Sequence, residues 1–142
     1  FTTAKGLCAG LPLGATVLGE KVESVLGYGD NGSTFGGNPI CCAGAISTLS
    51  RMDEALLAGV RERSERIVSA LTGKKGVKSV SGLGLLLGID PERDCGTVIN
   101  ECLEEGVLVH SAHGKVRLLP ALNIPLDQLD QALAVLVEVL GR

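Results

Sequence analysis

The second half of the chain switches between the two-residue apolar spacing of strands and the 3.6-residue spacing of helices. Four runs rich in branched apolar residues predict strands, at residues 77–80, 83–89, 107–109 and 116–119. One predicted helix runs from its N-cap Asp94 to Gly106, and another covers residues 126–140. Residues 73–142 are therefore expected to form a small α+β domain.

The first half holds one long helical pattern, at residues 39–71, after a stretch rich in turns. Asn38 and Pro39 are typical of a helix start, because Asn caps free backbone amides and Pro fits the first helical position. The apolar residues 40–46 occupy nearly every side of the helix, which predicts that its start is buried. Asp53 marks either a second helical segment or a bend.

This long helix links two parts of the chain, and we place the domain boundary at its end, near Gly73. The first part is residues 1–72 and the second is residues 73–142. A length of 142 residues suits one compact domain, or a small domain plus a piece of another. Because the chain has no initiator Met and starts within a motif, we expect it to be a fragment of a longer protein.

The composition narrows the range of partners. Apolar residues make up 45% and charged residues 20%, as in ordinary folded proteins, whereas aromatic residues reach only 2%. So few aromatic rings argue against stacking on single-stranded nucleic acid, and a net charge of −3 offers no basic surface to a phosphate backbone. No apolar run approaches the length of a membrane span. We therefore expect neither a nucleic-acid partner nor a membrane partner.

The cysteine pattern argues against a metal site. The chain has five cysteines, two of them adjacent, and no CxxC or Cys/His spacing occurs. Neither structural zinc nor a disulfide framework is therefore expected. Small buried thiols are typical of a reducing compartment, which favours the cytoplasm.

Lys5 lies in the first fifteen residues among small and apolar neighbours. Most lysines are solvated surface charges, and that interpretation fits Lys5 as well. The alternative is an amine held in a partly dehydrated pocket, where its pKa would fall. Because a neutral amine can attack a carbonyl carbon and form a Schiff base, Lys5 is a candidate nucleophile.

The loop at residues 30–38 is a candidate phosphate site. Ser33 and Thr34 offer hydroxyl groups, and the glycines at 36 and 37 let backbone amides approach a ligand closely. The helix that starts after the loop adds a partly positive end. The sequence contains neither a P-loop nor a dinucleotide-binding pattern, and a glycine-rich turn leading into a capped helix is the alternative interpretation.

Arg117 lies between apolar residues of a predicted strand. An arginine there can point into solvent, or its planar guanidinium can bind a carboxylate through two parallel hydrogen bonds. The histidines His110 and His113 have no Cys or Asp partner at motif spacing. Both histidines are therefore expected to be loop or edge residues.

Four parts of the sequence, in order along the chain, resemble class III aminotransferases. Residues 4–7 and 10–15 resemble the segment that carries the Schiff-base lysine, and residues 29–39 resemble the loop that contacts the cofactor phosphate. Residues 82–89 and 116–120 resemble strands of the small domain. Within the class, the amino-acid sequences of these motifs are most similar to those of the acetylornithine branch.

The resemblance implies an α/β enzyme of fold type I that depends on pyridoxal 5′-phosphate, with residues 1–72 ending its large cofactor-binding domain. Lys5 would form the Schiff base and then move the proton between substrate and cofactor. Ser33 and Thr34 would bind the cofactor phosphate, Thr34 across a homodimer interface, and Arg117 would bind a substrate carboxylate. The implied reaction, a step of arginine biosynthesis, moves the δ-amino group of N-acetylornithine to 2-oxoglutarate.

Two departures from the family pattern affect these expectations. Cys8 and Ala9 stand where the family often has glycines, which shifts the lysine loop slightly. The chain also matches only the C-terminal third or so of such an enzyme, without the parts that stack on the cofactor ring and tune it. This chain alone is therefore expected neither to hold the cofactor firmly nor to transaminate.

Two further interpretations stay open. Another class III aminotransferase would use ornithine, succinylornithine, 4-aminobutyrate or a carrier-linked lysine intermediate as its amino donor. A protein of a different class, a noncatalytic α+β interaction module, would leave Lys5 as a surface charge and the glycines as simple turns. The enzymes require Lys5 for activity, whereas the module does not, so replacing Lys5 distinguishes these interpretations.

Overall fold

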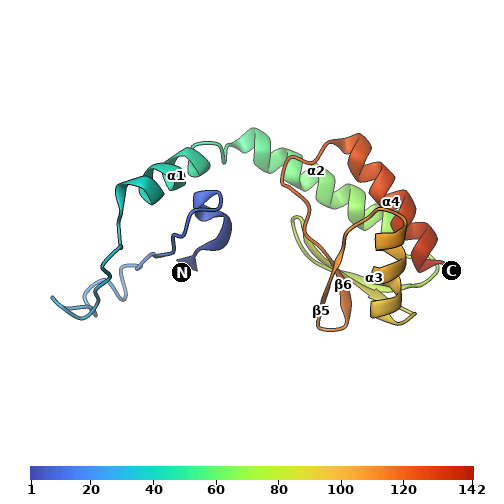
Figure 1. Ribbon diagram of the computed structural model, residues 1–142, viewed down its shortest axis with the longest axis horizontal. Coiled ribbons are helices and arrows are strands. Elements are labelled where there is room, and N and C mark those ends of the chain that lie inside the picture. The colour runs from blue at the N-terminus through green and yellow to red at the C-terminus, as the bar shows by residue number, and fades with distance from the viewer. The chain divides into compact units, whose positions relative to one another are not determined.

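The computed structural model describes residues 1–142, which fold into two compact units, Phe1–Asp53 and Glu54–Arg142. Helices and strands are mixed along the chain, as the sequence predicts (Figure 1). No helix combines the length and the apolar character that are needed to cross a bilayer.

The first unit is built around a short turn and one α-helix. Two short strands, β1 (Thr2–Thr3) and β2 (Ala15–Thr16), pair antiparallel on either side of the 3-10 turn η1 (Lys5–Cys8). Helix α1 (Pro39–Leu49) begins where the sequence predicts. The side chain of Asn38 accepts a hydrogen bond of 2.9 Å from a backbone amide of the first turn, so it caps the helix.

Cys8 joins η1 to α1. Its side chain is 1% exposed, and its thiol donates a hydrogen bond to the carbonyl oxygen of Cys41 at 2.8 Å. Gly44 allows this approach, because a Cβ at that position would lie 2.8 Å from Cys8 Sγ. Burial raises the pKa of the Cys8 thiol. Cys8 is therefore a packed, protonated anchor rather than a nucleophile.

The rest of α1 is more exposed than its sequence predicts. Cys41 and Ala45 are buried, but Ile40 is 73% exposed and Ile46 is 70% exposed. The expectation of a buried helix start is therefore wrong for one side of the helix, because η1 is the main element that packs against α1. Apolar side chains in solvent on this scale are typical of a surface that other protein covers.

The second unit contains a four-stranded antiparallel sheet in the order β3–β4–β6–β5. The strands are β3 (Val77–Leu83), β4 (Leu86–Pro91), β5 (His110–Ala112) and β6 (Lys115–Leu118). The two hairpins meet in the middle of the sheet, where β4 pairs with β6. This pairing places Arg117 directly opposite Gly88.

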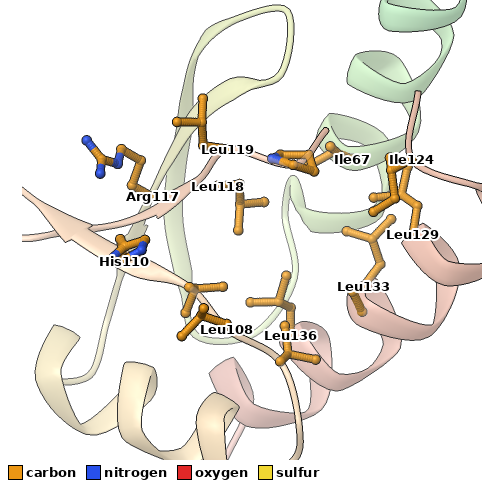
Figure 2. Close-up of a pocket in the computed structure, with 14 residues that line it drawn as sticks. Ile67, Leu108, His110, Arg117, Leu118, Leu119, Ile124, Leu129, Leu133 and Leu136 are labelled. Carbon is orange, nitrogen blue, oxygen red and sulfur yellow. The ribbon is translucent and has the colours of Figure 1, made fainter. Parts of the chain in front are cut away.

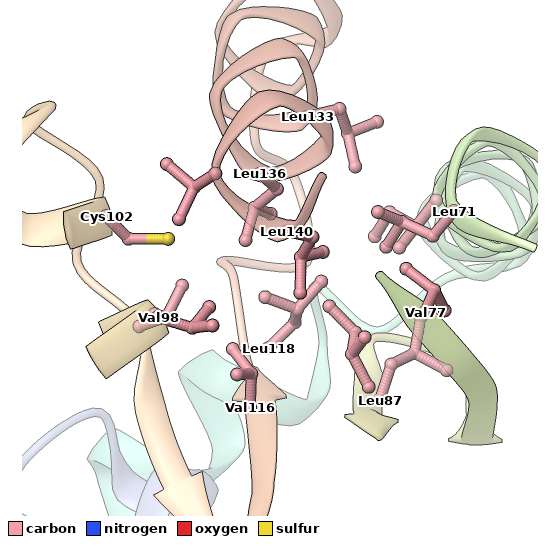
Figure 3. Packing of buried hydrophobic residues seen from close by; sticks show 14 of the residues in the cluster. Leu71, Val77, Leu87, Val98, Cys102, Val116, Leu118, Leu133, Leu136 and Leu140 are labelled. Carbon is pink, nitrogen blue, oxygen red and sulfur yellow. The ribbon is translucent and has the colours of Figure 1, made fainter. Parts of the chain in front are cut away.

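Three helices pack on one face of this sheet, α2 (Glu54–Leu71), α3 (Cys95–Glu104) and α4 (Leu126–Leu140). Figure 3 shows side chains from all three helices converging on Leu87, Val116 and Leu118 of the sheet. These aliphatic residues form one continuous core without a buried polar side chain. Each fully buried Leu, Ile or Val contributes about 1.5–3 kcal/mol of hydrophobic stabilisation.

Two strand boundaries differ from the sequence prediction. Gly84, with a φ of +57°, lies in the turn between β3 and β4, so residues 83–89 are not one strand. Residues 107–109 precede β5 instead of forming it, because the Val107 amide donates a 2.7 Å hydrogen bond to the Cys102 carbonyl. That bond satisfies a carbonyl near the end of α3 and draws the segment away from the sheet.

The helical pattern at residues 39–71 is divided between α1 and α2, with a break just before Glu54. Ile67 and Leu71 of α2 belong to the core of the second unit, so the compact units separate after Asp53. The predicted parts 1–72 and 73–142 assign α2 to the first part instead. How the domains of a whole enzyme divide stays a prediction.

Arg93, just before α3, bonds both to α3 and to the end of α4. Two guanidinium nitrogens of Arg93 donate to the Glu101 carboxylate at 2.5 and 2.9 Å, and Arg93 also donates to the Val139 carbonyl at 2.8 Å. The hydrogen bonds from Arg93 hold the pKa of Glu101 below its ordinary value of 4.5.

Replacing Glu101 with Gln is expected to make the second unit less sensitive to acid. Because folding lowers the pKa of Glu101, its carboxylate stabilises the fold above about pH 4.5, and this stabilisation is lost as the pH falls through the depressed value. The free energy of unfolding in urea, measured from about pH 7 to about pH 3, should therefore fall less steeply in Glu101→Gln. Glu104→Gln, the same change at an exposed position of α3, is the control. Equal slopes in the two variants would remove Glu101 from the acid response.

Candidate active site

Lys5 begins η1 in a left-handed backbone conformation, with a φ of +54°. This conformation costs a non-glycine residue about 1–2 kcal/mol, and such strain is often retained at functional positions. Ala9, which follows the turn, is also left-handed, with a φ of +48°. Ala9 therefore keeps a backbone shape that glycine adopts more readily, so the departure from the family pattern leaves the turn in place.

The Lys5 side chain is exposed, and its amine takes part in no hydrogen bond or ion pair. Within the first unit, Lys5 therefore fits the interpretation as a solvated surface charge, and the partly dehydrated pocket of the alternative interpretation is not formed. The turn itself is fixed, because the buried Cys8 holds its other end against α1. The result is an unpaired, solvent-exposed amine on an anchored turn.

The loop that carries Ser33 and Thr34 borders a cleft of about 570 Å³ in the first unit. Ser33 lines this cleft together with residues 12–14, which follow the Lys5 turn, and with the first residues of α1. The structure therefore brings Ser33 beside the segment that carries Lys5. Thr34 is exposed next to Ser33 and does not line the cleft.

Two local features make this cleft suitable for an anion. The cleft includes the start of α1, where backbone amides and the helix dipole favour negative charge. Gly36 packs tightly on Ser33, since a Cβ at Gly36 would lie 3.0 Å from Ser33 Cβ, and Gly37 has a φ of +68°. The glycines thus allow the loop to fold back close to the helix start.

Arg117 lies on β6 of the second unit and is half-buried. Its Nε is enclosed without a hydrogen-bond partner, and no carboxylate pairs with its guanidinium. A buried donor without a partner is costly, which makes the environment of Arg117 unusual for a structural arginine. Full exposure of Arg117 to solvent is not observed, and its binding of a carboxylate stays a prediction.

An apolar pocket of about 260 Å³ lies beside Arg117, between the ends of β5 and β6 and the helices α2 and α4. Figure 2 shows Leu118 pointing into this pocket, whereas the guanidinium of Arg117 points away from it. His110, opposite Arg117 in the adjacent strand, begins β5 at the edge of the sheet, as expected. The charge of Arg117 is therefore directed away from the helices and the core.

The family model for class-III aminotransferases matches residues 1–140 of this chain. The chain therefore belongs to the class III aminotransferases, which are enzymes dependent on pyridoxal 5′-phosphate. The acetylornithine aminotransferase of Haemophilus ducreyi is 43% identical over 99% of the chain, and the enzyme of that name from Aquifex aeolicus is 40% identical over 96%. The chain covers 36% of each of these relatives, about a third of their length.

Solved structures support the same assignment. The acetylornithine aminotransferase of Elizabethkingia anophelis matches with a TM-score of 0.84 at 27% identity, over 98% of this chain and 38% of that chain. An ornithine aminotransferase of Toxoplasma gondii, crystallised with partial occupancy of PLP at its active site, matches with a TM-score of 0.86 at 29% identity. That match covers 99% of this chain and 36% of the other. The α/β fold is that of fold-type-I aminotransferases, as predicted.

The structure also reveals residues that the sequence prediction missed. Lys115 and Ser81 lie in the same cleft as Arg117, on the side of the sheet opposite the helices. The alternation of β6 places Lys115 and Arg117 on one face, and this signal was present in the sequence. The contribution of Ser81 depends on sheet order, which local sequence does not specify.

Proposed function

We propose that this chain is the C-terminal part of an enzyme that moves the δ-amino group of N-acetylornithine to 2-oxoglutarate, a step of arginine biosynthesis. The names of the curated relatives from Haemophilus ducreyi and Aquifex aeolicus support this choice of amino donor. The observation that carries the proposal is Lys5, an unpaired amine on a strained and anchored turn, within a chain that matches the family from residue 1 to residue 140.

The residues of this chain fit pyridoxal 5′-phosphate. When bound, this cofactor supplies an electron sink for the substrate amine. Lys5 would bind the cofactor aldehyde covalently through Nζ and, once displaced by the substrate, would hold and move a proton at that atom. The hydroxyl groups of Ser33 and Thr34 would donate hydrogen bonds to the phosphate, close to the positive end of α1.

Arg117 would orient the substrate. A guanidinium binds a carboxylate through two parallel hydrogen bonds, which fixes both the position and the direction of the substrate chain. The enclosed Nε without a partner supports this role, because a carboxylate would satisfy it. Both glutamate and 2-oxoglutarate carry such a carboxylate.

The enzyme would act as a homodimer in which Thr34 reaches the cofactor of the partner subunit. Large apolar side chains near Thr34 support an interface there, since Phe35 is 81% exposed and Ile40 is 73% exposed. Tyr28, in the same loop region, is fully exposed as well. Burial of these side chains against a second subunit would stabilise the dimer.

A second candidate amino donor is ornithine. Structures of ornithine aminotransferases from Toxoplasma gondii and Plasmodium falciparum match this chain at TM-scores of 0.86 and 0.85. Among the solved structures the identities are similar, 29% for these two and 27% for the acetylornithine aminotransferase of Elizabethkingia anophelis. The preference for N-acetylornithine therefore rests on the curated acetylornithine aminotransferases at 43% and 40% identity. Comparing kcat/KM for the two donors in the full-length protein separates these candidates.

Borohydride reduction tests the role of Lys5 directly. In the full-length protein, reduction in the presence of pyridoxal 5′-phosphate should fix the cofactor on the peptide that contains Lys5, detected as a mass increase of that peptide. The 142-residue chain alone should show little labelling, because its Lys5 amine is exposed to solvent and the chain lacks the parts of the enzyme that stack on the cofactor ring. Labelling of the full-length protein at another lysine would contradict the proposal, and stable labelling of Lys5 in the chain alone would contradict the expected weak binding.

A further inference from the structure

The turn η1 combines strained backbone with a single buried side chain. Lys5 at its start and Ala9 just after its end are both left-handed, with φ values of +54° and +48°. Such conformations are unfavourable for residues with a Cβ, and they persist only where the surrounding structure holds them. Cys8 is the one buried residue of the turn, so the protein holds this shape through Cys8.

Two thiols join the segment that carries Lys5 to helix α1. The Cys8 thiol donates a hydrogen bond to the Cys41 carbonyl oxygen at 2.8 Å, and the Cys41 thiol donates to the Pro12 carbonyl oxygen at 3.5 Å. Both cysteine side chains are buried, at 1% and 5% exposed. Thiols are weak donors, so the packing of the two sulfur atoms adds to these bonds. Residues 8–12 are therefore held against the first turn of α1 at two points.

The fit between Cys8 and α1 is close. Gly44 faces the Cys8 sulfur, and a Cβ at position 44 would lie 2.8 Å from that atom and 3.3 Å from Leu11 Cδ1. The helix therefore leaves no room for a side chain of its own at this point, and the sulfur fills the space instead. A glycine at position 8, which the resemblance to class III aminotransferases leads one to expect, would make no such contact.

One hydrogen-bonded turn connects the position of Cys8 to that of Lys5. The two residues are three apart, which is the length of one 3-10 turn, and the Leu7 amide donates to the Ala4 carbonyl oxygen at 3.0 Å across Lys5. A displacement of Cys8 therefore moves the backbone of Lys5 with it. Such a movement matters for an amine that must meet a carbonyl carbon, because a misplacement of about 1 Å can slow a reaction by about 10²-fold.

We propose that Cys8 is a positioning residue for Lys5, whose buried side chain fixes the turn η1 on α1 and thereby sets the place of the Lys5 amine. The inference rests on the proposed function, in which Lys5 binds the cofactor aldehyde. Cys8 acts only through the turn, because its thiol is buried against α1. Loosening this contact slows the steps that need the amine and leaves substrate binding by Arg117, in the second unit, unchanged.

Amide hydrogen exchange of the 142-residue chain, followed by NMR, tests the anchor without any cofactor. The amides of Leu7 and Ala9 donate the hydrogen bonds that close the turn, and they should exchange about tenfold faster in Cys8→Ala than in the unmodified chain. Cys8→Ser keeps a donor at the same place and should restore most of the protection. Cys102→Ala removes an equally buried thiol from the core of the second unit and should leave both amides unchanged.

Single-turnover kinetics of the full-length protein test the link to Lys5. When the cofactor-loaded enzyme is mixed with N-acetylornithine, the maximal rate of the absorbance change should fall about tenfold in Cys8→Ala. The half-saturating donor concentration should stay within about twofold, whereas a merely structural role would lower the amount of folded enzyme and not its rate. Gly44→Ala keeps Cys8 but inserts a Cβ against its sulfur, so it should slow the same step. Cys102→Ala should react at the rate of the unmodified protein.

An unchanged maximal rate in folded Cys8→Ala would overturn the proposal, and so would unchanged exchange of the two amides. The NMR spectrum shows whether Cys8→Ala is folded; if it is not, Gly44→Ala takes its place, and an unchanged rate there has the same meaning. Equal slowing in Cys102→Ala would also contradict a role specific to the turn. Failure of the proposed function is distinct, because the unmodified protein would then show no borohydride labelling at Lys5. Labelling at Lys5 with unchanged rates in the variants contradicts the role of Cys8 alone.

Discussion

Replacing Lys5 with Ala in the full-length protein is expected to lower kcat by about a thousandfold or more. The variant loses both the amine that binds the cofactor covalently and the group that moves the proton, and acid–base catalysis alone contributes roughly 10²–10⁴-fold. The fold should be unaffected, because the Lys5 side chain is exposed and makes no hydrogen bond or ion pair. The initial rate of 2-oxoglutarate consumption with N-acetylornithine as the donor measures the loss.

Lys21→Ala is the matched control, since Lys21 is an exposed lysine of the same unit that lies outside every residue set proposed for the site. It should retain the rate of the unmodified protein. Retained activity in Lys5→Ala would remove Lys5 from the mechanism. A large loss in both variants would point to a general effect of charge instead.

The elements of the second unit were predictable because local signals agree with the tertiary structure. The side chain of Asp94 accepts a 2.8 Å hydrogen bond from the Thr97 amide and starts α3 at the predicted position. Gly106, with a φ of +83°, ends the same helix as expected. In this unit the apolar spacing also identifies the buried face of each helix, because one continuous core receives all three.

The candidate site was less predictable, because it depends on contacts between distant segments. Sequence motifs identify Lys5 and Arg117 as candidate site residues. The exposure of the Lys5 amine, however, depends on which segments surround it. Likewise, Ser81 and Lys115 are 34 residues apart, and only the order of the strands brings their side chains within hydrogen-bond distance. Apolar spacing alone could not show that Ile40 would be exposed. The spacing indicates which residues are hydrophobic, but it does not indicate which segments are available to cover them.

Replacing Gly76 with Ala is expected to destabilise the second unit by about 3 kcal/mol or more. Gly76 has a φ of +81°, which costs a residue with a Cβ about 1–2 kcal/mol. In addition, a Cβ at Gly76 would lie 1.7 Å from the carbonyl oxygen of Leu140, so the end of α4 would have to move away from the start of β3. Overpacking of this kind adds about 1–3 kcal/mol.

Gly73→Ala separates the two contributions. Gly73 has a φ of +71°, similar to that of Gly76, but a Cβ there would meet nothing within 4 Å. Its cost should therefore be limited to backbone strain, about 1–2 kcal/mol. Urea denaturation followed by the NMR signals of core methyl groups such as those of Leu140 measures both free energies of unfolding. Equal losses in the two variants would show that α4 moves freely at its end, whereas a larger loss at Gly76 means that the contact with Leu140 fixes the helix against the sheet.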